Sequence, residues 1–385
     1  VEYGADAVYI AGKQFGMRAA PGNFSVEEIE KACKICHNEN IKLYVTCNTL
    51  PRNDEIPFLP DFIKECAKAG VDAFIVADLG VLSIVKKHAP DIDIHISTQA
   101  GIVNYASALA MYDLGAKRVV LARELNLEEI KGIRENTPAD LEIEAFVHGA
   151  MCMSFSGRCL LSNYMTGRDA NRGSCAQPCR WEYYLIEKQR DGILYEIEED
   201  RTGSYVLNSK DMCLIKEIPK LLEAGITSLK IEGRAKSEYY VASVTSAYRR
   251  AVDFYLSHPG EDLPDFILEE TEKTSHREYS RGFYFGGEPG QTTDHGGYIR
   301  NYDVVAVSEG NIEDGFVKLK QRNKFLKGDT ADVLSPGKPP FEIKLYEIYN
   351  EYMQPIDSAP HAEMTVVAKV NVNIEKGSYL RVRRK

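Results

Sequence analysis

The sequence contains no apolar run long enough to cross a membrane, and no charged and then apolar leader opens it. These absences argue against a membrane protein and against export, so we expect a cytoplasmic location. An excess of positive charge is also lacking, because the formal net charge is -10. This argues against indiscriminate binding to nucleic acid, since phosphate recognition needs clustered positive charge, and any contact with RNA must be local.

Two hydrolase motifs are absent as well, H-E-x-x-H and G-x-S-x-G. A thiol peptidase stays open as an alternative, with Cys152 as the nucleophile and His148 as its base. However, five of the nine cysteines lie between His148 and Leu229. Five cysteines exceed what a nucleophile requires, so proteolysis is the weaker interpretation.

Nine cysteines are an odd number for a large chain without a secretory leader. A disulfide framework is therefore not expected, and metal binding or redox chemistry is favoured. Cys47 and Cys66 are expected to be ordinary core thiols.

The segment Cys33-Lys-Ile-Cys36-His37 matches the attachment motif of c-type haem. Ser25 and Glu28 form a capping box in front of it, which predicts a helix with Cys33 and Cys36 on its apolar face. Because no export signal is visible, the helical interpretation is favoured over haem attachment.

Short apolar segments alternate with stretches long enough to form crossover helices. They are apolar at nearly every position, which is typical of parallel strands covered on both faces. This pattern predicts a TIM-like (β/α) barrel over residues 1–289. Only seven strands can be counted and the chain starts without Met, so we expect the first strand and the natural N-terminus to be missing. The predicted strands are 7–11, 43–47, 73–77, 92–96, 118–122, 143–148 and 229–232.

One stretch between strands, beginning at His148, is much longer than the others, which predicts a cysteine-rich insertion over residues 149–213. In such barrels the loops after the strands build the active site. Polar residues at the ends of the other predicted strands indicate the same end of the barrel as the active site. For His95 a structural role is an equal alternative, and Glu232 and Arg234 could form a structural salt bridge. The candidates for substrate contact are His95, Gln99, His148, Glu232 and Arg234.

The pattern changes near residue 290 to short alternating strands separated by Gly, Asp, Asn and Pro turns. This predicts a small β-barrel domain over residues 290–385. Its predicted strands include 304–307, 316–319, 331–334, 365–370 and 379–382.

Four of the clustered cysteines fall within 28 residues, and a fifth follows at position 213. Thiolates are soft ligands that suit zinc or iron-sulfur clusters. Structural zinc sites usually show paired C-x2-C spacings, which are absent among these clustered cysteines. An iron-sulfur cluster is therefore favoured, with zinc and ordinary buried thiols left open. The candidate ligands are Cys152, Cys159, Cys175, Cys179 and Cys213.

Residues 150–181 contain four arginines against one acidic residue, Asp169. This local excess is compatible with contacts to RNA phosphates, and an ordinary solvated surface is the alternative. The candidate RNA-binding residues are Arg158, Arg168, Arg172 and Arg180.

The runs EAFVHGAMC at 144–152 and GRCLLS at 157–162 closely resemble the signature of the collagenase-like bacterial peptidase family of unassigned catalytic type, peptidase family U32. Other segments resemble the same family and extend the likeness over the whole predicted barrel. The C-terminal strands resemble the family's C-terminal β domain. These segments are ADAVYI at 5–10, YVTCNT at 44–49, HISTQ at 95–99, GRDANRG at 167–173 and KIEGR at 230–234.

The resemblance implies a function other than proteolysis. Similar members of this family carry out oxygen-independent hydroxylation of tRNA wobble uridine, of rRNA cytidine or of the ubiquinone ring, and they carry a 4Fe-4S cluster. The C-terminal β domain places the chain nearest to the tRNA members, which implies tRNA as the partner, 5-hydroxyuridine as the product and prephenate as the hydroxyl source. Whether a homologous partner protein is needed stays open. A scaffold protein that has no enzymatic activity and whose insertion is held by a structural metal also stays open. The implied cluster ligands are Cys152, Cys159, Cys175 and Cys213, with Cys179 in reserve.

Overall fold

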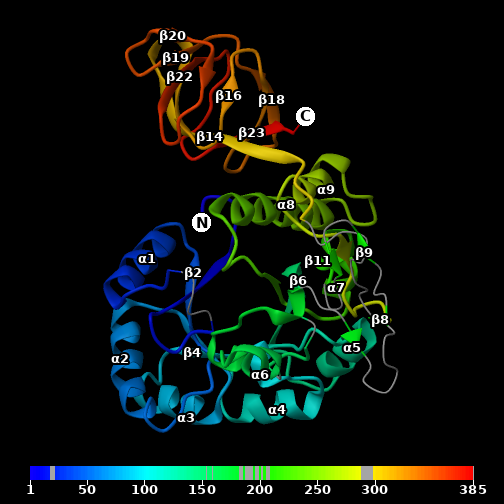
Figure 1. Ribbon diagram of the computed structural model, residues 1–385. Helices are drawn as coiled ribbons and strands as arrows, with labels where there is room; N and C mark the ends of the chain where they lie inside the picture. The colour runs from blue at the N-terminus through cyan, green and yellow to red at the C-terminus, as the bar shows by residue number, and fades with distance from the viewer. Residues whose placement is uncertain are drawn as a thin grey trace. The chain divides into compact units, whose positions relative to one another are not determined.

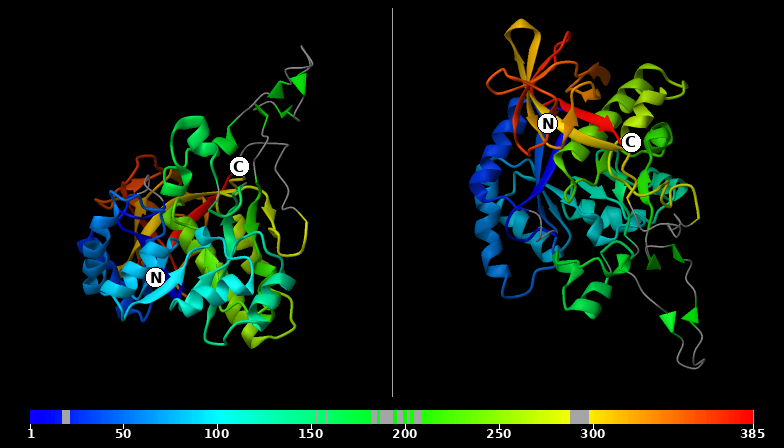
Figure 2. Two further views of the ribbon diagram at one scale, coloured as in Figure 1. Left: turned by 90° about the horizontal axis from the view of Figure 1, so that it is seen from below. Right: turned by 45° about the horizontal axis from the view of Figure 1, so that its top comes forward.

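The computed structural model describes residues 1–17, 22–152, 154–157, 159–181, 209–287 and 298–384, and the backbone of four short strands between residues 185 and 204. Contacts divide the chain into two units, each with its own sheet (Figure 1, Figure 2). The first unit comprises Val1, Asp6–Ala235 and the described part of Arg277–Gly297. The second comprises Glu2–Ala5, Lys236–His276 and the described part of Tyr298–Lys385.

The first unit contains a curved sheet in which seven strands run parallel, in the order β1-β2-β3-β4-β5-β6-β12. Helices alternate with these strands along the chain and lie on the outer side of the sheet (Figure 1). The strands are β1 (Ala7–Ala11), β2 (Lys42–Cys47), β3 (Ala73–Val76), β4 (Asp93–Ile96), β5 (Arg118–Val120), β6 (Glu142–Ala150) and β12 (Ser228–Ile231). The helices are α1 (Val26–Asn38), α2 (Leu59–Ala69), α3 (Leu79–His88), α4 (Tyr105–Asp113), α5 (Leu127–Glu135) and α7 (Ile218–Glu223).

All seven strands predicted from the sequence are present, within two residues of their expected bounds at each end. The expected closed TIM barrel is not confirmed, because in the described part of the chain the parallel order ends at β1 and β12 and no pairing joins these two strands. A further strand, β11 (Asp211–Cys213), pairs antiparallel with the end of β6 and parallel with β13 (Tyr279–Ser280).

Helix α1 shows why the haem-like motif is structural. The predicted capping box is present, since Ser25 and Glu28 bond to each other's backbone N–H groups. Cys33 and Cys36 lie on the buried face of the helix, and burial raises the pKa of the Cys33 thiol to about 11. His37 instead lies outside and contacts Asp72 at 2.9 Å. The expected apolar helix face is confirmed, as is the burial of Cys47 and Cys66.

The second unit contains an antiparallel sheet that curls into a half-barrel, where the sequence predicted a small β-barrel. The sheet ends at β18 on one side and at β20 on the other. Its apolar core includes Leu319, Phe325, Val333 and Leu380, each at most 1% exposed. The strand order is β18 (Phe341–Lys344), β17 (Thr330–Leu334), β23 (Tyr379–Arg383), β14 (Tyr302–Ile312), β15 (Phe316–Gln321), β22 (Thr365–Lys369), β19 (Ile348–Asn350) and β20 (Pro355–Ile356). The short strands β16 (Phe325–Leu326) and β21 (Ser358–Ala359) pair with each other.

A buried cluster of charges attaches helices to this half-barrel. Arg381 of β23 is 0% exposed and contacts Glu270 at 2.5 Å and Asp332 at 3.3 Å. Lys273 contacts the same two carboxylates at 2.9 and 2.6 Å. The second unit therefore includes α8 (Glu238–Ser257) and α9 (Asp265–Glu272), whereas the sequence analysis assigned residues up to 289 to the first domain. Local residue patterns do not show that Arg381 meets Glu270 and Asp332.

Within the described ranges, no helix of either unit is long and apolar enough to cross a membrane.

Replacing Arg381 by Met is expected to lower the free energy of unfolding of the second unit by about 3–5 kcal/mol. The reason is that the two buried carboxylates, Glu270 and Asp332, would lose one of their two counter-charges and retain Lys273 alone. Hydrogen exchange of the amides of β15 and β17 measures the change. Arg384→Met is the matched control, since Arg384 pairs with Asp303 at the surface and its loss should change stability by less than about 1 kcal/mol. Equal effects of the two variants would contradict the role of Arg381.

Candidate functional site

The parallel strands all end at one edge of their sheet, which we call the carboxyl edge. In parallel α/β folds this edge carries the binding and catalytic loops. Gln99 lies in a short helix directly after β4, His148 lies in β6, and Glu232 and Arg234 follow β12. Four of the five predicted substrate-contact residues are therefore at or beside this edge.

Glu232 connects three strands at the carboxyl edge. Its Oε2 accepts a hydrogen bond from the Tyr9 hydroxyl at 3.3 Å, and its backbone N–H donates to the carbonyl of His148 at 2.9 Å. Gly149 packs against it so closely that a Cβ there would lie 2.8 Å from the Glu232 carbonyl oxygen. With a φ of +120°, this position requires glycine. The contacts hold Glu232 between β1, β6 and β12.

Arg234 and the neighbouring loops form further polar contacts. The Nη2 of Arg234 donates to Asn23 Oδ1 at 2.8 Å, which orients the guanidinium. Asn48 Nδ2 donates to Ser97 Oγ at 3.3 Å, and Asn48 Oδ1 accepts from the backbone N–H of Met17 at 3.3 Å. The loops after β1, β2 and β4 are thus joined by side-chain amide and hydroxyl groups.

His95 lies inside β4 and is 3% exposed, with its ring 4.6 Å from that of Tyr44. Burial lowers the pKa of His95 to about 3, and the charge of Arg118 acts in the same direction. The imidazole is therefore neutral near pH 7 and cannot donate a proton as an acid there. Contact between His95 and a substrate stays a prediction.

A buried ionic cluster beneath the carboxyl edge was missed by the sequence analysis. Glu144 of β6 contacts Lys230 of β12 at 2.6 Å and Arg118 of β5 at 2.7 Å, and it accepts a hydrogen bond from Ser228 at 2.8 Å. Burial by itself would raise the pKa of Glu144, but the two cations outweigh burial and lower it to about 2. Lys230 also lies 4.5 Å from the centre of the Tyr9 ring. Charged residues inside otherwise apolar predicted strands were the signal that could have revealed this cluster.

The cysteine-rich insertion contacts the carboxyl edge first near β4 and β5. Ser156 donates its backbone N–H to Glu124 Oε1 at 2.9 Å, and its hydroxyl contacts the same carboxylate. Gly157 adopts a φ of +75°, and a Cβ there would lie only 2.3 Å from the carbonyl oxygen of Gln99. This close approach positions the start of the insertion over the loop after β4.

A second contact lies over the loops after β1 and β2. Arg172 Nη2 contacts Glu55 Oε2 at 2.6 Å. A Cβ on Gly173 would lie 2.9 Å from the carbonyl oxygen of Gly16 and from the carbonyl carbon of Met17. The insertion therefore extends along the carboxyl edge between these two contacts, through α6 (Leu161–Thr166).

The four predicted RNA-binding arginines have different surroundings. Arg172 is half-buried in its pair with Glu55, and Arg168 is exposed with its Nε donating to the carbonyl of Ser174 at 3.1 Å. Arg158 lies outside the described residues, as does the side chain of Arg180. RNA binding by these residues stays a prediction.

The clustered cysteines are more accessible than the core thiols. Cys152 and Cys175 are exposed, and Cys159, Cys179 and Cys213 are partly buried. Cys213 lies opposite His148 in the β11–β6 pairing. Among the residues that the structure describes, no group of three or more His, Cys, Asp or Glu side chains is placed to hold a metal ion. Binding of a cluster by these cysteines stays a prediction.

The alternative thiol-peptidase pair differs in accessibility. Cys152 is exposed, whereas His148 is 1% exposed, with its ring 5.4 Å from that of Tyr279. The peptidase interpretation needs His148 to reach a thiol at the surface.

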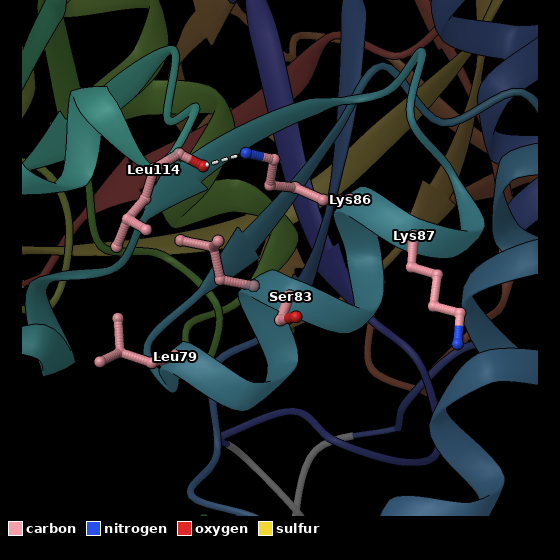
Figure 3. A pocket seen from close by; sticks show the side chains of 6 residues that line it. Leu79, Ser83, Lys86, Lys87 and Leu114 are labelled. Atoms are coloured by element: carbon pink, nitrogen blue, oxygen red, sulfur yellow. Dashed lines mark hydrogen bonds between the residues drawn. The ribbon is translucent and has the colours of Figure 1, made fainter.

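A surface pocket of about 450 Å³ lies on the outer side of α3, next to the end of α4 (Figure 3). Lys86 crosses it and donates to the carbonyl of Leu114 at 2.8 Å. No acidic, histidine or cysteine side chain is among its lining residues, and its titratable side chains are the two lysines. The lining consists of Leu79, Leu82, Ser83, Lys86, Lys87 and Leu114.

Comparison with known proteins identifies the family. Residues 1–294 match the model of Peptidase family U32, and residues 300–381 match that of the Peptidase family U32 C-terminal domain. The chain belongs to peptidase family U32.

Curated relatives of this U32 chain carry different names. It is 39% identical to tRNA hydroxylation protein P1 of Bacillus subtilis (strain 168), over 99% of this chain and 90% of that protein. It is 34% identical to tRNA hydroxylation protein P of Escherichia coli (strain K12), over 97% and 91%. It is also 32% identical to a protein named Collagenase of Porphyromonas gingivalis (strain ATCC BAA-308 / W83), over 93% and 88%. The resemblance found in the sequence is confirmed.

Replacing Gly157 by Ala should detach the start of the insertion from the U32 sheet, because the new methyl group would collide with the Gln99 carbonyl. Limited proteolysis should then cleave residues 150–181 at least about ten times faster, since the lost contacts correspond to 1.4 kcal/mol or more of local opening. Gly167→Ala is the matched control, because Gly167 also has a positive φ of +69° but has nothing within 4 Å of the added Cβ. If both variants are cleaved equally fast, backbone strain rather than the Gln99 contact explains the effect.

Proposed function

We propose that this U32 chain is an enzyme that hydroxylates tRNA, converting the wobble uridine to 5-hydroxyuridine without molecular oxygen. The observation that carries the proposal is its similarity, over both units, to two proteins named for tRNA hydroxylation. Such similarity over nearly the whole chain includes the insertion and the C-terminal domain as well as the sheet. The cytosolic location expected from the sequence belongs to this proposal.

The geometry of the first unit supports a small, covered reaction site. The insertion lies along the carboxyl edge, where Glu232 and Arg234 are held by contacts from β1, β6 and the segment before α1. Glu232 is the carboxylate of this set that could take up a proton during the reaction. We assign Arg234 to substrate binding, because a guanidinium keeps its charge and presents several donors in one plane.

The hydroxyl group that is added to the uracil ring must come from a donor molecule that is itself reduced in the reaction. Replacing the C–H bond of the uracil ring by a C–OH bond oxidises the base, so a donor R–OH must accept hydrogen and leave as R–H. We propose prephenate, a small molecule with carboxylate groups, as this donor. Its use in place of oxygen gas is part of the same hypothesis.

We also propose that a 4Fe-4S cluster is bound by Cys152, Cys159, Cys175 and Cys213, with Cys179 as the reserve ligand. The accessibility of Cys152 and Cys175 and the softness of thiolate donors support this assignment. When bound, such a cluster would supply redox or Lewis-acid chemistry above the carboxyl edge. The chain's own residues would bind and orient the substrates.

Expression of this chain in a bacterial strain that lacks its own tRNA hydroxylation proteins should restore 5-hydroxyuridine in tRNA, measured by mass spectrometry of tRNA nucleosides. Glu232→Gln should lower the restored amount at least about tenfold, because the carboxylate could no longer act as a base. The exposed Glu223→Gln on α7 is the matched control and should restore the wild-type level. Cleavage of a collagen peptide by the purified chain, with tRNA left unmodified, would replace this proposal by the peptidase alternative.

The cluster has a separate test. Protein purified without oxygen should contain iron and acid-labile sulfide and absorb visible light, and Cys213→Ala should lose most of both elements because one ligand is removed. Cys36→Ala, which changes a buried thiol of α1, should keep them. If the wild-type protein contains zinc or no metal, the proposed 4Fe-4S cluster is wrong. A non-enzymatic scaffold held by a structural zinc would then be reconsidered.

A further inference from the structure

The ends of β2 and β12 bring a hydroxyl group and a guanidinium to the same point. Gly16, which follows β1, lies between them. A Cβ built on Gly16 would be 2.7 Å from the Ala11 methyl group, 3.3 Å from Thr46 Oγ1 and 3.4 Å from Arg234 Nη2. Both polar groups therefore approach the position where this glycine has no side chain. We call Thr46, Arg234 and Gly16 together the Thr46 site.

The Thr46 hydroxyl is unusual within the part of the chain that the structure describes. Thr46 is 3% exposed, and its Oγ1 has no hydrogen-bond partner there. Nearly all buried polar groups in folded proteins do have a partner, because an unpaired buried hydroxyl is destabilising. Valine has almost the same shape and would avoid this cost. The hydroxyl therefore points to a partner outside the described residues.

Arg234 supplies the second observation and indicates the chemistry of that partner. Its guanidinium is oriented by Asn23 at 2.8 Å, and a planar guanidinium matches the geometry of a carboxylate. A hydroxyl group can donate a further hydrogen bond to the same anion. Glu232 lies nearby, but its carboxylate accepts hydrogen bonds from the Tyr9 hydroxyl and from the backbone N–H of Arg234.

The surroundings favour a small molecule over a polynucleotide. The backbone of Gly173, in the insertion, packs closely against the loop at Gly16. A Cβ built on Gly173 would lie 2.9 Å from the carbonyl oxygen of Gly16 and from the carbonyl carbon of Met17. The loop that carries Gly16 is thus covered by the insertion, and Thr46 itself is almost inaccessible. A phosphate in an RNA backbone could not reach such a hydroxyl without bringing neighbouring nucleotides with it.

We propose that Thr46 and Arg234 bind one carboxylate group of the small-molecule co-substrate at the carboxyl edge. The inference rests on the proposed function insofar as that function requires a small carboxylate as the hydroxyl donor. Thr46 was not among the residues predicted from the sequence, because its position in β2 resembles that of any other threonine in a strand.

The test is direct binding of prephenate to the purified full chain, measured by isothermal titration calorimetry without tRNA. Thr46→Val should weaken binding about tenfold, because one hydrogen bond to a charged group is lost. Arg234→Lys should weaken it about 10- to 100-fold, because the planar pair of donors is lost. Thr46→Ser retains the hydroxyl and should bind within about threefold of the wild type.

Stability measurements separate ligand binding from a structural role. Because the Thr46 hydroxyl has no partner in the free protein, Thr46→Val should leave the midpoint of thermal unfolding unchanged or raise it. The control Thr271→Val removes a buried hydroxyl on α9 that donates to the Leu268 carbonyl at 2.8 Å, so it should lower the midpoint but leave prephenate affinity unchanged.

The proposal is overturned if prephenate does not bind the wild-type chain, or if Thr46→Val and Arg234→Lys bind it as tightly as the wild type. Loss of binding in these two variants supports it whether or not tRNA is hydroxylated. If the wild-type chain binds prephenate through Thr46 and Arg234 but forms no 5-hydroxyuridine, the proposed function fails while the carboxylate site stands.

Discussion

The ionic cluster around Glu144 is the interaction on which the rest of the first unit depends. Glu144 joins β5, β6 and β12, because Arg118 and Lys230 both contact its carboxylate. A buried carboxylate is stable only when such partners compensate for lost hydration, so the three strands must keep this arrangement. Glu232 and Arg234 directly follow β12. The cluster therefore determines where the two candidate site residues lie at the carboxyl edge.

Above this cluster, close backbone contacts position the insertion. Gly157 approaches the Gln99 carbonyl, and Gly173 approaches the loop at Gly16, at separations that leave no room for a Cβ. Glycine is needed because the backbones themselves meet. These contacts bring a cysteine-rich segment over strand ends that carry an oriented guanidinium and a buried hydroxyl. The combination is compatible with the proposed small-molecule site beneath a cysteine-rich segment.

Much of the fold could be predicted from residue patterns. The seven parallel strands, the capped helix α1 and the antiparallel C-terminal strands all follow from local apolar periodicity and turn residues. Closure of the sheet could not be predicted in this way, and the expected barrel is not confirmed. The attachment of α8 and α9 to the half-barrel was also missed, because it depends on Arg381 meeting Glu270 and Asp332.

By itself, the sequence determined the family, the strand order along the chain and the residue types available for chemistry, because these depend on local pattern and on matching motifs. The tertiary structure alone decided which of those residues meet. It placed His95 in the interior as a neutral imidazole, paired Arg172 with Glu55, and brought the Thr46 hydroxyl and the Arg234 guanidinium to the same glycine, Gly16. The physical reason is that burial, ion pairing and pKa depend on distances between residues far apart in the chain, which periodicity does not encode.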